Sequence, residues 1–279
     1  MVAPVEERIP GSDGLTLFLR SWRPAGAARA VVVICPGFNA HSGQYFWVAD
    51  QLVASNYAVY AIDLRGRGRS DGERFYVDSI DQYVSDLSAA VKVAKTREAG
   101  LPVYLLGHSA GGVVACTYAL DNQAELAGLI CESFAFQVPA PDFAIAALKG
   151  LSHLAPHAHV LALKNEFFSR DPAQVKTMNE DPLIAHETQP TRTVAALAIA
   201  DDRLKAEFPK ITLPVLILHG KMDKATKYQG SQFFFDTAGS KDKTLKLYDQ
   251  GYHDLLNDTE KETVMGDIKT WLETHAPKS

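Results

Sequence analysis

The segment GHSAG, residues 107–111, matches the pattern G-x-S-x-G, in which a serine lies between two glycines. An apolar run typical of a strand precedes it, and a pattern typical of a helix follows it at Gly111–Asn122. Small residues around a sharp strand-to-helix turn leave the serine hydroxyl clear of the chain. The backbone N–H of Ala110 can then donate to an oxyanion at the helix N-terminus. We therefore predict that Ser109 is the nucleophile of an acyl-transfer reaction.

A serine hydroxyl needs a base that removes its proton, and the base needs an acid that fixes its tautomer. Among the nine histidines, His253 alone lies on a loop after the last strand pattern, where this motif expects its base. Asp223 follows the strand pattern Leu213–His219 by a short loop, at the end of a strand where catalytic groups gather in α/β sheets. The chain order Ser109, Asp223, His253 therefore predicts a catalytic triad.

Two other carboxylates stay open as the acid of this triad. Glu132 ends the core strand pattern that follows the serine, and Asp254 is the immediate neighbour of His253. Adjacent side chains rarely have room to aim at each other, so Asp254 is the poorer alternative. His219, at the end of a strand pattern, is interpreted as structural.

The loop PGFNAHSG, which follows the apolar run AVVVIC, is expected to supply the second oxyanion donor. Gly37 allows a tight turn, and the backbone N–H of Phe38 is the candidate donor. Pro36 has no N–H and cannot fill this role. Asn39 and His41 are candidate substrate contacts, although a polar loop needs such residues in any case.

Strand patterns alternate with helical patterns along most of the chain. The strand patterns are Val5–Pro10, Thr16–Trp22, Ala30–Cys35, Tyr57–Ile62, Val103–Leu106, Ala127–Cys131, Leu213–His219 and Thr244–Tyr248. The helical patterns are Tyr45–Ala54, Ile80–Thr96, Gly111–Asn122, Gly230–Ala238 and Thr259–His275. Several strands are apolar on both faces, which is typical of parallel strands covered on both sides. The sequence predicts an α/β fold with a mostly parallel central sheet and helices on both faces.

Residues 133–208 interrupt this alternation, because they contain helical or irregular patterns and no convincing core strand. The strand signals resume at Leu213. We therefore expect an α/β core formed by residues 1–132 and 209–279, with residues 133–208 inserted as a helical cap.

Composition excludes several classes of function. The chain has 279 residues, 47% of them hydrophobic, and a formal net charge of -5, which argues against a nucleic-acid partner. No secretory signal and no apolar stretch of about 18 residues is present, so we expect no membrane span and a cytoplasmic location. The three cysteines lie in apolar or helical surroundings and read as buried thiols. We find no metal-ligand spacing and expect neither a metal nor a cofactor.

Several stretches together resemble the α/β-hydrolases, and more narrowly the monoacylglycerol lipase and lysophospholipase branch. They are GHSAG, PGFNAHSGQY, DLRGRGRSDGERFYV, IDQYVSDLSAAV, SRDPAQVKTMNEDPL and GYHDLLND. The chain departs from the branch at Pro36-Gly37, where the branch usually has His-Gly. It departs again at KATKYQGS, which lacks the usual apolar run and proline.

The resemblance implies a serine esterase that cleaves a monoacylglycerol, a lysophospholipid or a similar acyl ester through an acyl-enzyme, without a cofactor. It also implies an acyl pocket lined by apolar cap residues, for which Phe143 and Leu148 are candidates. The expected partner is the small acyl ester, with transient contact to lipid aggregates; the oligomeric state stays open. The alternatives are a short-chain carboxylesterase, a thioesterase, a peptidase, or a ligand-binding protein without catalysis.

Overall fold

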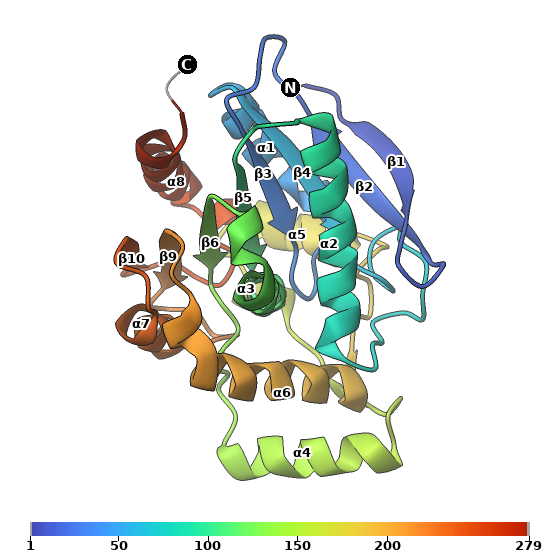
Figure 1. Cartoon of the computed structure of the whole chain (residues 1–279). Coiled ribbons are helices and arrows are strands. Elements are labelled where there is room, and N and C mark those ends of the chain that lie inside the picture. The colour runs from blue at the N-terminus through green and yellow to red at the C-terminus, as the bar shows by residue number, and fades with distance from the viewer. Residues whose placement is uncertain (1, 278–279) are drawn as a thin grey trace.

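A computed structural model describes residues 2–277 (Figure 1). The ends of the predicted core segments, residue 1 and residues 278–279, lie outside the described residues. The core is an 8-stranded sheet, hydrogen-bonded in the order β1-β2-β4-β3-β5-β6-β9-β10. Its strands are β1 (Val5–Pro10), β2 (Thr16–Trp22), β3 (Ala30–Cys35), β4 (Tyr57–Asp63), β5 (Val103–His108), β6 (Gly128–Glu132), β9 (Val215–Gly220) and β10 (Lys243–Tyr248).

At one edge of the sheet β2 pairs antiparallel with both of its neighbours, β1 and β4, whereas all the other pairs of neighbouring strands are parallel. This confirms the mostly parallel sheet predicted from the alternating patterns. The predicted strand bounds hold to within a few residues, and β5 runs on through His108, directly up to Ser109.

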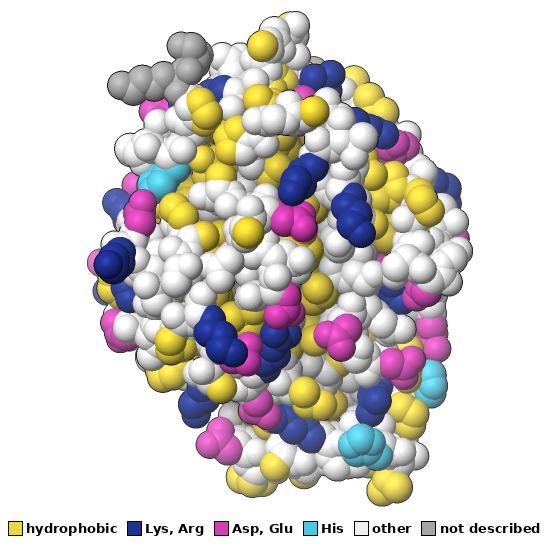
Figure 2. Space-filling model, viewed as in Figure 1, with side chains coloured by type: hydrophobic (Ala, Val, Ile, Leu, Met, Phe, Trp, Pro, Cys, Tyr) yellow, Lys and Arg dark blue, Asp and Glu magenta, His cyan; other side chains and the backbone are white. Residues whose placement is uncertain are grey.

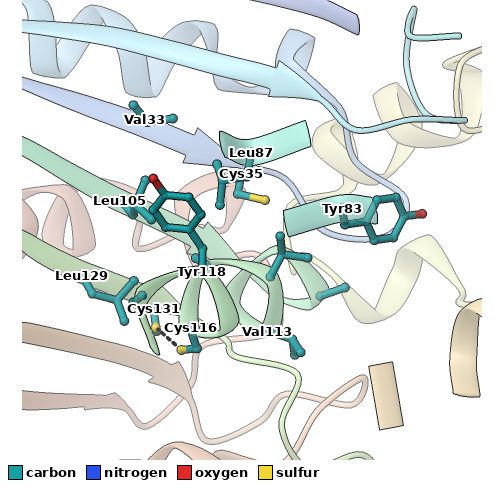
Figure 3. Packing of buried hydrophobic residues seen from close by; sticks show 14 of the residues in the cluster. Val33, Cys35, Tyr83, Leu87, Leu105, Val113, Cys116, Tyr118, Leu129 and Cys131 are labelled. Carbon is teal, nitrogen blue, oxygen red and sulfur yellow. Dashed lines mark hydrogen bonds between the residues drawn. The ribbon is translucent and has the colours of Figure 1, made fainter. Parts of the chain in front are cut away.

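Helices cover both faces of the sheet, because alternate side chains of the central strands point to opposite sides. One face packs against α1 (Phe46–Val53) and α8 (Lys261–His275), and the other against α2 (Ile80–Arg97), α3 (Ala110–Asn122) and α7 (Tyr228–Thr237). Figure 3 shows the buried hydrophobic cluster on the face covered by α2, α3 and α7, which includes Cys35 and Leu105 from the strands and Val113 from α3. Fully buried strands explain why their sequences lack a polar face.

Residues 133–208, here called the inserted segment, contribute no strand to the 8-stranded sheet. They form α4 (Asp142–Leu154), β7 (His159–Leu161), α5 (Pro172–Glu180), β8 (Gln189–Pro190) and α6 (Thr191–Glu207). The short strands β7 and β8 pair only with each other. In Figure 1, α6 crosses below α3 and the lower end of α2, and α4 lies outside α6, farther from the sheet.

Within residues 2–277, none of the helices combines the length and the hydropathy that crossing a bilayer requires.

Candidate active site

Ser109 is the single residue between the end of β5 and the start of α3. Its φ is 54° and its ψ is -122°, a conformation that a non-glycine residue adopts only when the surrounding structure enforces it. Gly111 explains part of the enforcement, since a Cβ there would lie 2.0 Å from the carbonyl oxygen of Cys35. The backbone of β3 therefore lies directly against the turn that carries Ser109.

His253 links the hydroxyl of Ser109 to the carboxylate of Asp223. Its Nε2 lies 2.8 Å from Ser109 Oγ, and its Nδ1 lies 2.8 Å from Asp223 Oδ2. Ser109 is 4% exposed and His253 is fully buried. The structure thus brings together the three residues that the sequence pattern predicted for a triad, although they are far apart in the chain.

The loop after β9 fixes the carboxylate of Asp223. Its Oδ1 accepts hydrogen bonds from the backbone N–H groups of Ala225 at 2.7 Å and Thr226 at 2.9 Å. Burial works against ionisation of this carboxyl, but the neighbouring His253 and His219 outweigh that effect and lower the pKa of Asp223. Asp223 is therefore ionised and can hold the proton of His253 on Nδ1.

His219 also contacts this acid, which the sequence interpretation did not foresee. Its Nε2 lies 3.1 Å from Asp223 Oδ2, and its Nδ1 lies 2.7 Å from the hydroxyl of Ser231. Burial lowers the pKa of His219, although Asp223 opposes the shift. The spacing of four residues between His219 and Asp223, across the end of a strand, was the one available signal.

The two alternative acids point elsewhere. Glu132 accepts a hydrogen bond from the backbone N–H of Leu255 at 2.6 Å, and its other oxygen lies 3.8 Å from Nε2 of His108. Asp254 accepts from the side chain of Asn257 at 2.9 Å. Neither carboxylate is hydrogen-bonded to the imidazole of His253, so the geometry favours Asp223.

His108, Glu132 and Asp254 form a buried cluster behind the serine, with donor atoms within 4.8 Å of one another. Burial lowers the pKa of His108 to about 3 and, together with Asp254, raises the pKa of Glu132 well above its ordinary value. His108 and Glu132 are therefore neutral side chains packed inside the core, whereas burial raises the pKa of Asp254 only to about 6.

The loop after β3 lies against the serine turn. A Cβ on Gly37 would approach Ser109 Cβ to 2.7 Å and the backbone nitrogen of Ala110 to 3.2 Å, so only glycine fits here. Within residues 2–277, neither the Phe38 N–H nor the Ala110 N–H donates a hydrogen bond. Both amides are therefore free to donate to an oxyanion formed beside Ser109.

Asn39 and His41, which the sequence suggested as substrate contacts, are hydrogen-bonded to the inserted segment. The side-chain amide of Asn39 donates to Asn165 Oδ1 at 2.9 Å and to the carbonyl oxygen of Leu163 at 3.2 Å. Nε2 of His41 lies 2.7 Å from Asp181 Oδ2. The loop and the inserted segment are thus joined by polar contacts.

The predicted acyl-pocket residues on α4 do not lie together at the serine. Phe143 is 77% exposed and Leu148 is half-buried, on a helix that packs against α6. The inserted segment instead places Phe168 against the base, with its ring edge-on to His253 at a centroid distance of 4.8 Å. A pocket role for Phe143 and Leu148 stays a prediction.

A mostly parallel sheet covered by helices, with a strained serine between a strand and a helix, defines an α/β-hydrolase. The chain belongs to the family described as serine aminopeptidase, S33 (Hydrolase_4), whose model matches residues 26–260. It is a serine hydrolase of the esterase and lipase type.

Three known proteins show how close this relationship is. The chain is 31% identical to the monoacylglycerol lipase of Mycolicibacterium smegmatis, over 97% of this chain and 97% of that protein. It is 33% identical to human monoglyceride lipase, over 94% of this chain and 88% of that protein. The crystal structure of the monoacylglycerol lipase of Paleococcus ferrophilus matches with a TM-score of 0.80 at 30% identity, covering 92% and 99% of the two chains.

Proposed function

We propose that this protein hydrolyses monoacylglycerols or similar single-chain acyl esters, with Ser109, His253 and Asp223 as its catalytic triad. The observation that carries the proposal is the continuous chain of 2.8 Å hydrogen bonds from Ser109 Oγ through the imidazole to Asp223 Oδ2. The substrate class is supported by the names of the three proteins compared above, each a monoacylglycerol or monoglyceride lipase matched over nearly the whole chain.

The mechanism has two halves. In the first, His253 takes the proton of Ser109, whose oxygen attacks the ester carbonyl and forms a tetrahedral oxyanion. The imidazolium then gives that proton to the departing alcohol, and an acyl-enzyme remains. In the second, His253 takes a proton from water, the resulting nucleophile attacks the acyl-enzyme, and the fatty acid leaves as Ser109 regains its proton. Asp223 stays ionised throughout and stabilises the imidazolium.

The oxyanion of both halves is assigned to the free amides of Phe38 and Ala110. Their position beside Ser109 is fixed by the close approach of Gly37 to the serine turn. Because such donors act in a buried site, each can lower the barrier by about 3 kcal/mol.

The inserted segment is proposed to act as a cap that receives substrate from lipid aggregates. Six of its apolar side chains are more than a third exposed: Val138, Phe143, Leu151, Leu154, Val160 and Ile199. Figure 2 shows apolar side chains along the lower edge of the molecule, where α4 lies in Figure 1. An exposed apolar surface suits transient contact with an aggregate of acyl chains. The cytoplasmic location stays a prediction from the sequence.

Labelling with a fluorophosphonate tests the nucleophile. The wild-type protein and Ser133→Ala should label, whereas Ser109→Ala should not label and should lose ester turnover. Ser133 is a matched control, because it is buried like Ser109 and also has a positive φ, of 45°. Near-normal turnover by folded Ser109→Ala would exclude the proposed triad, and an unlabelled wild type would favour a ligand-binding protein without catalysis.

A series of p-nitrophenyl esters, with 1-monooleoylglycerol and lysophosphatidylcholine, tests the substrate class. We expect kcat/KM to rise with acyl length until the pocket is filled, since each buried methylene contributes about 0.8 kcal/mol. A rate that is highest for acetate and falls with every added carbon would point to a short-chain carboxylesterase instead.

A further inference from the structure

The oxyanion loop is held from outside by a carboxylate of the inserted segment. Oε1 of Glu187 accepts a hydrogen bond from the backbone N–H of Asn39 at 3.0 Å, although the two residues are 148 positions apart in the chain. The Glu187 side chain is 1% exposed. Asn39 directly follows Phe38, whose amide is the proposed oxyanion donor. We propose that Glu187 is a positioning residue for the oxyanion hole, an inference that rests on the proposed function.

The backbone of Asn39 explains why this loop needs support. Its φ is 51°, in the left-handed region that residues other than glycine seldom adopt. The amide of Asn39 belongs to the peptide unit that follows the Cα of Phe38. If that unit were displaced, the Cα of Phe38 would shift, and the N–H bonded to that Cα would shift with it. The hydrogen bond to Glu187 opposes the displacement, because a buried N–H without an acceptor is destabilising.

Arg67 removes the electrostatic penalty of a carboxylate at this position. Its guanidinium donates to the same Oε1 of Glu187 and lies 4.3 Å above the ring of Phe38. Gln189 donates to that oxygen as well, at 2.6 Å. An unpaired negative charge here would oppose the developing oxyanion, whereas the ion pair offers Asn39 an acceptor with no net charge. Arg67 therefore supports both the acceptor and the side chain of the donor residue.

Thr193 provides a matched control for the attachment of the inserted segment. Its hydroxyl donates to the carbonyl oxygen of Phe75 at 2.9 Å and accepts from the backbone N–H of Val77 at 3.0 Å. These bonds join the inserted segment to the core without contacting the oxyanion loop. Thr193→Val removes both bonds with little change in shape, so it weakens attachment and leaves Asn39 untouched.

The test compares Glu187→Ala, Glu187→Asp, Glu187→Gln and Thr193→Val with the wild type. Competent active sites are counted by fluorophosphonate titration, so that loss of folded protein does not count as loss of rate. For each variant, kcat and KM are measured on p-nitrophenyl butyrate. The Ki of a trifluoromethyl ketone is measured too, because its adduct with Ser109 carries an oxyanion in the hole.

In Glu187→Ala we expect kcat per titrated site to fall at least about tenfold, Ki to rise by a similar factor, and KM not to rise. Glu187→Asp keeps the charge beside Arg67 but moves the acceptor away from the Asn39 N–H, so it should show the same loss. This variant keeps the test valid if the alanine variant does not fold. Glu187→Gln still offers an amide oxygen and should recover most of the rate. Thr193→Val should leave kcat per site and Ki within about twofold of the wild type.

Unchanged kcat per site and unchanged Ki in Glu187→Ala and Glu187→Asp would overturn the proposal, whatever their melting temperatures, because Glu187 would then be only structural. Equal losses of kcat and rises of Ki in Thr193→Val would overturn it too, because attachment of the segment in general would be responsible. Failure of the proposed function is separate, since it would be seen in wild type that neither labels nor hydrolyses esters.

Discussion

Nε2 of His219 donates a hydrogen bond to Oδ2 of Asp223, the same oxygen that accepts a hydrogen bond from Nδ1 of His253. The hydroxyl of Thr226 reaches that oxygen as well, at 2.7 Å. Three donors on one buried oxygen keep the acid ionised and fix its direction. His219 therefore extends the proposed triad inward by one residue.

We expect His219→Phe to lower kcat about tenfold with little change in KM, because one hydrogen bond to a charged group contributes about 1.5–3 kcal/mol. Steady-state kinetics on a soluble ester measures this, with active sites counted by titration. Ser231→Ala is the matched control, since it removes only the outer partner of His219 and should cost less. An unchanged kcat in His219→Phe would mean that Asp223 is held well enough without it.

The choice of acid is tested by two isosteric amides. Asp223→Asn should lower kcat by orders of magnitude, because the amide no longer stabilises the imidazolium and favours the wrong tautomer of His253. Glu132→Gln should retain most of the activity, because its Oε1 still accepts from the backbone N–H of Leu255. If the two results were reversed, the acid would be Glu132.

Glu132 also predicts a pH dependence of stability. Its raised pKa keeps the buried carboxyl protonated at pH values where the unfolded chain, with an ordinary pKa near 4.5, has lost that proton. The unfolded state then binds fewer protons, so the free energy of unfolding falls as pH rises, by about 1.4 kcal/mol per unit until the folded pKa is reached. Urea unfolding at about pH 5 and about pH 8 should show Glu132→Gln gaining stability relative to the wild type as pH rises. A constant difference would mean that Glu132 is ionised in the folded protein.

The exposed end of α4 predicts a difference between dispersed and aggregated substrate. Leu154 is 86% exposed. Leu154→Asp should slow hydrolysis of monooleoylglycerol in emulsions or vesicles and leave turnover of a soluble short-chain ester unchanged, because only binding to the aggregate surface is affected. Val5→Asp on β1, 60% exposed, is the control and should change neither rate. If Leu154→Asp and the wild type hydrolysed aggregated substrate at equal rates, this surface would have no part in substrate delivery.

The sequence was most informative where local chemistry restricts the choice of residue. The strand Ala30–Cys35 is predicted with the bounds that the structure shows, because a short apolar run rich in β-branched residues favours a covered strand. The sharp turn at Ser109, between a strand and a helix, is predictable because it tolerates only small neighbours. In both cases the restriction lies within a few residues of chain.

Contacts between distant parts of the chain left no such signal. Glu187 reads as one acidic residue in an irregular stretch, and nothing near it indicates a bond to the amide of Asn39. Phe143 reads as a pocket residue because it is apolar, but periodicity does not say which side of α4 meets another element. That choice depends on α6, which occupies the space between α4 and the core.

The packing of Phe168, from the inserted segment, against His253 has a consequence for substrate affinity if an ester enters only when this segment moves aside. Binding would then be confined to the molecules whose segment is open. The apparent dissociation constant is the intrinsic one divided by the fraction of open molecules, so a tenfold rarer open form binds about tenfold more weakly. In that case the contacts of Asp181 with His41 and of Asn165 with Asn39 would adjust the concentration at which the enzyme responds to its substrate, through the fraction of open molecules alone.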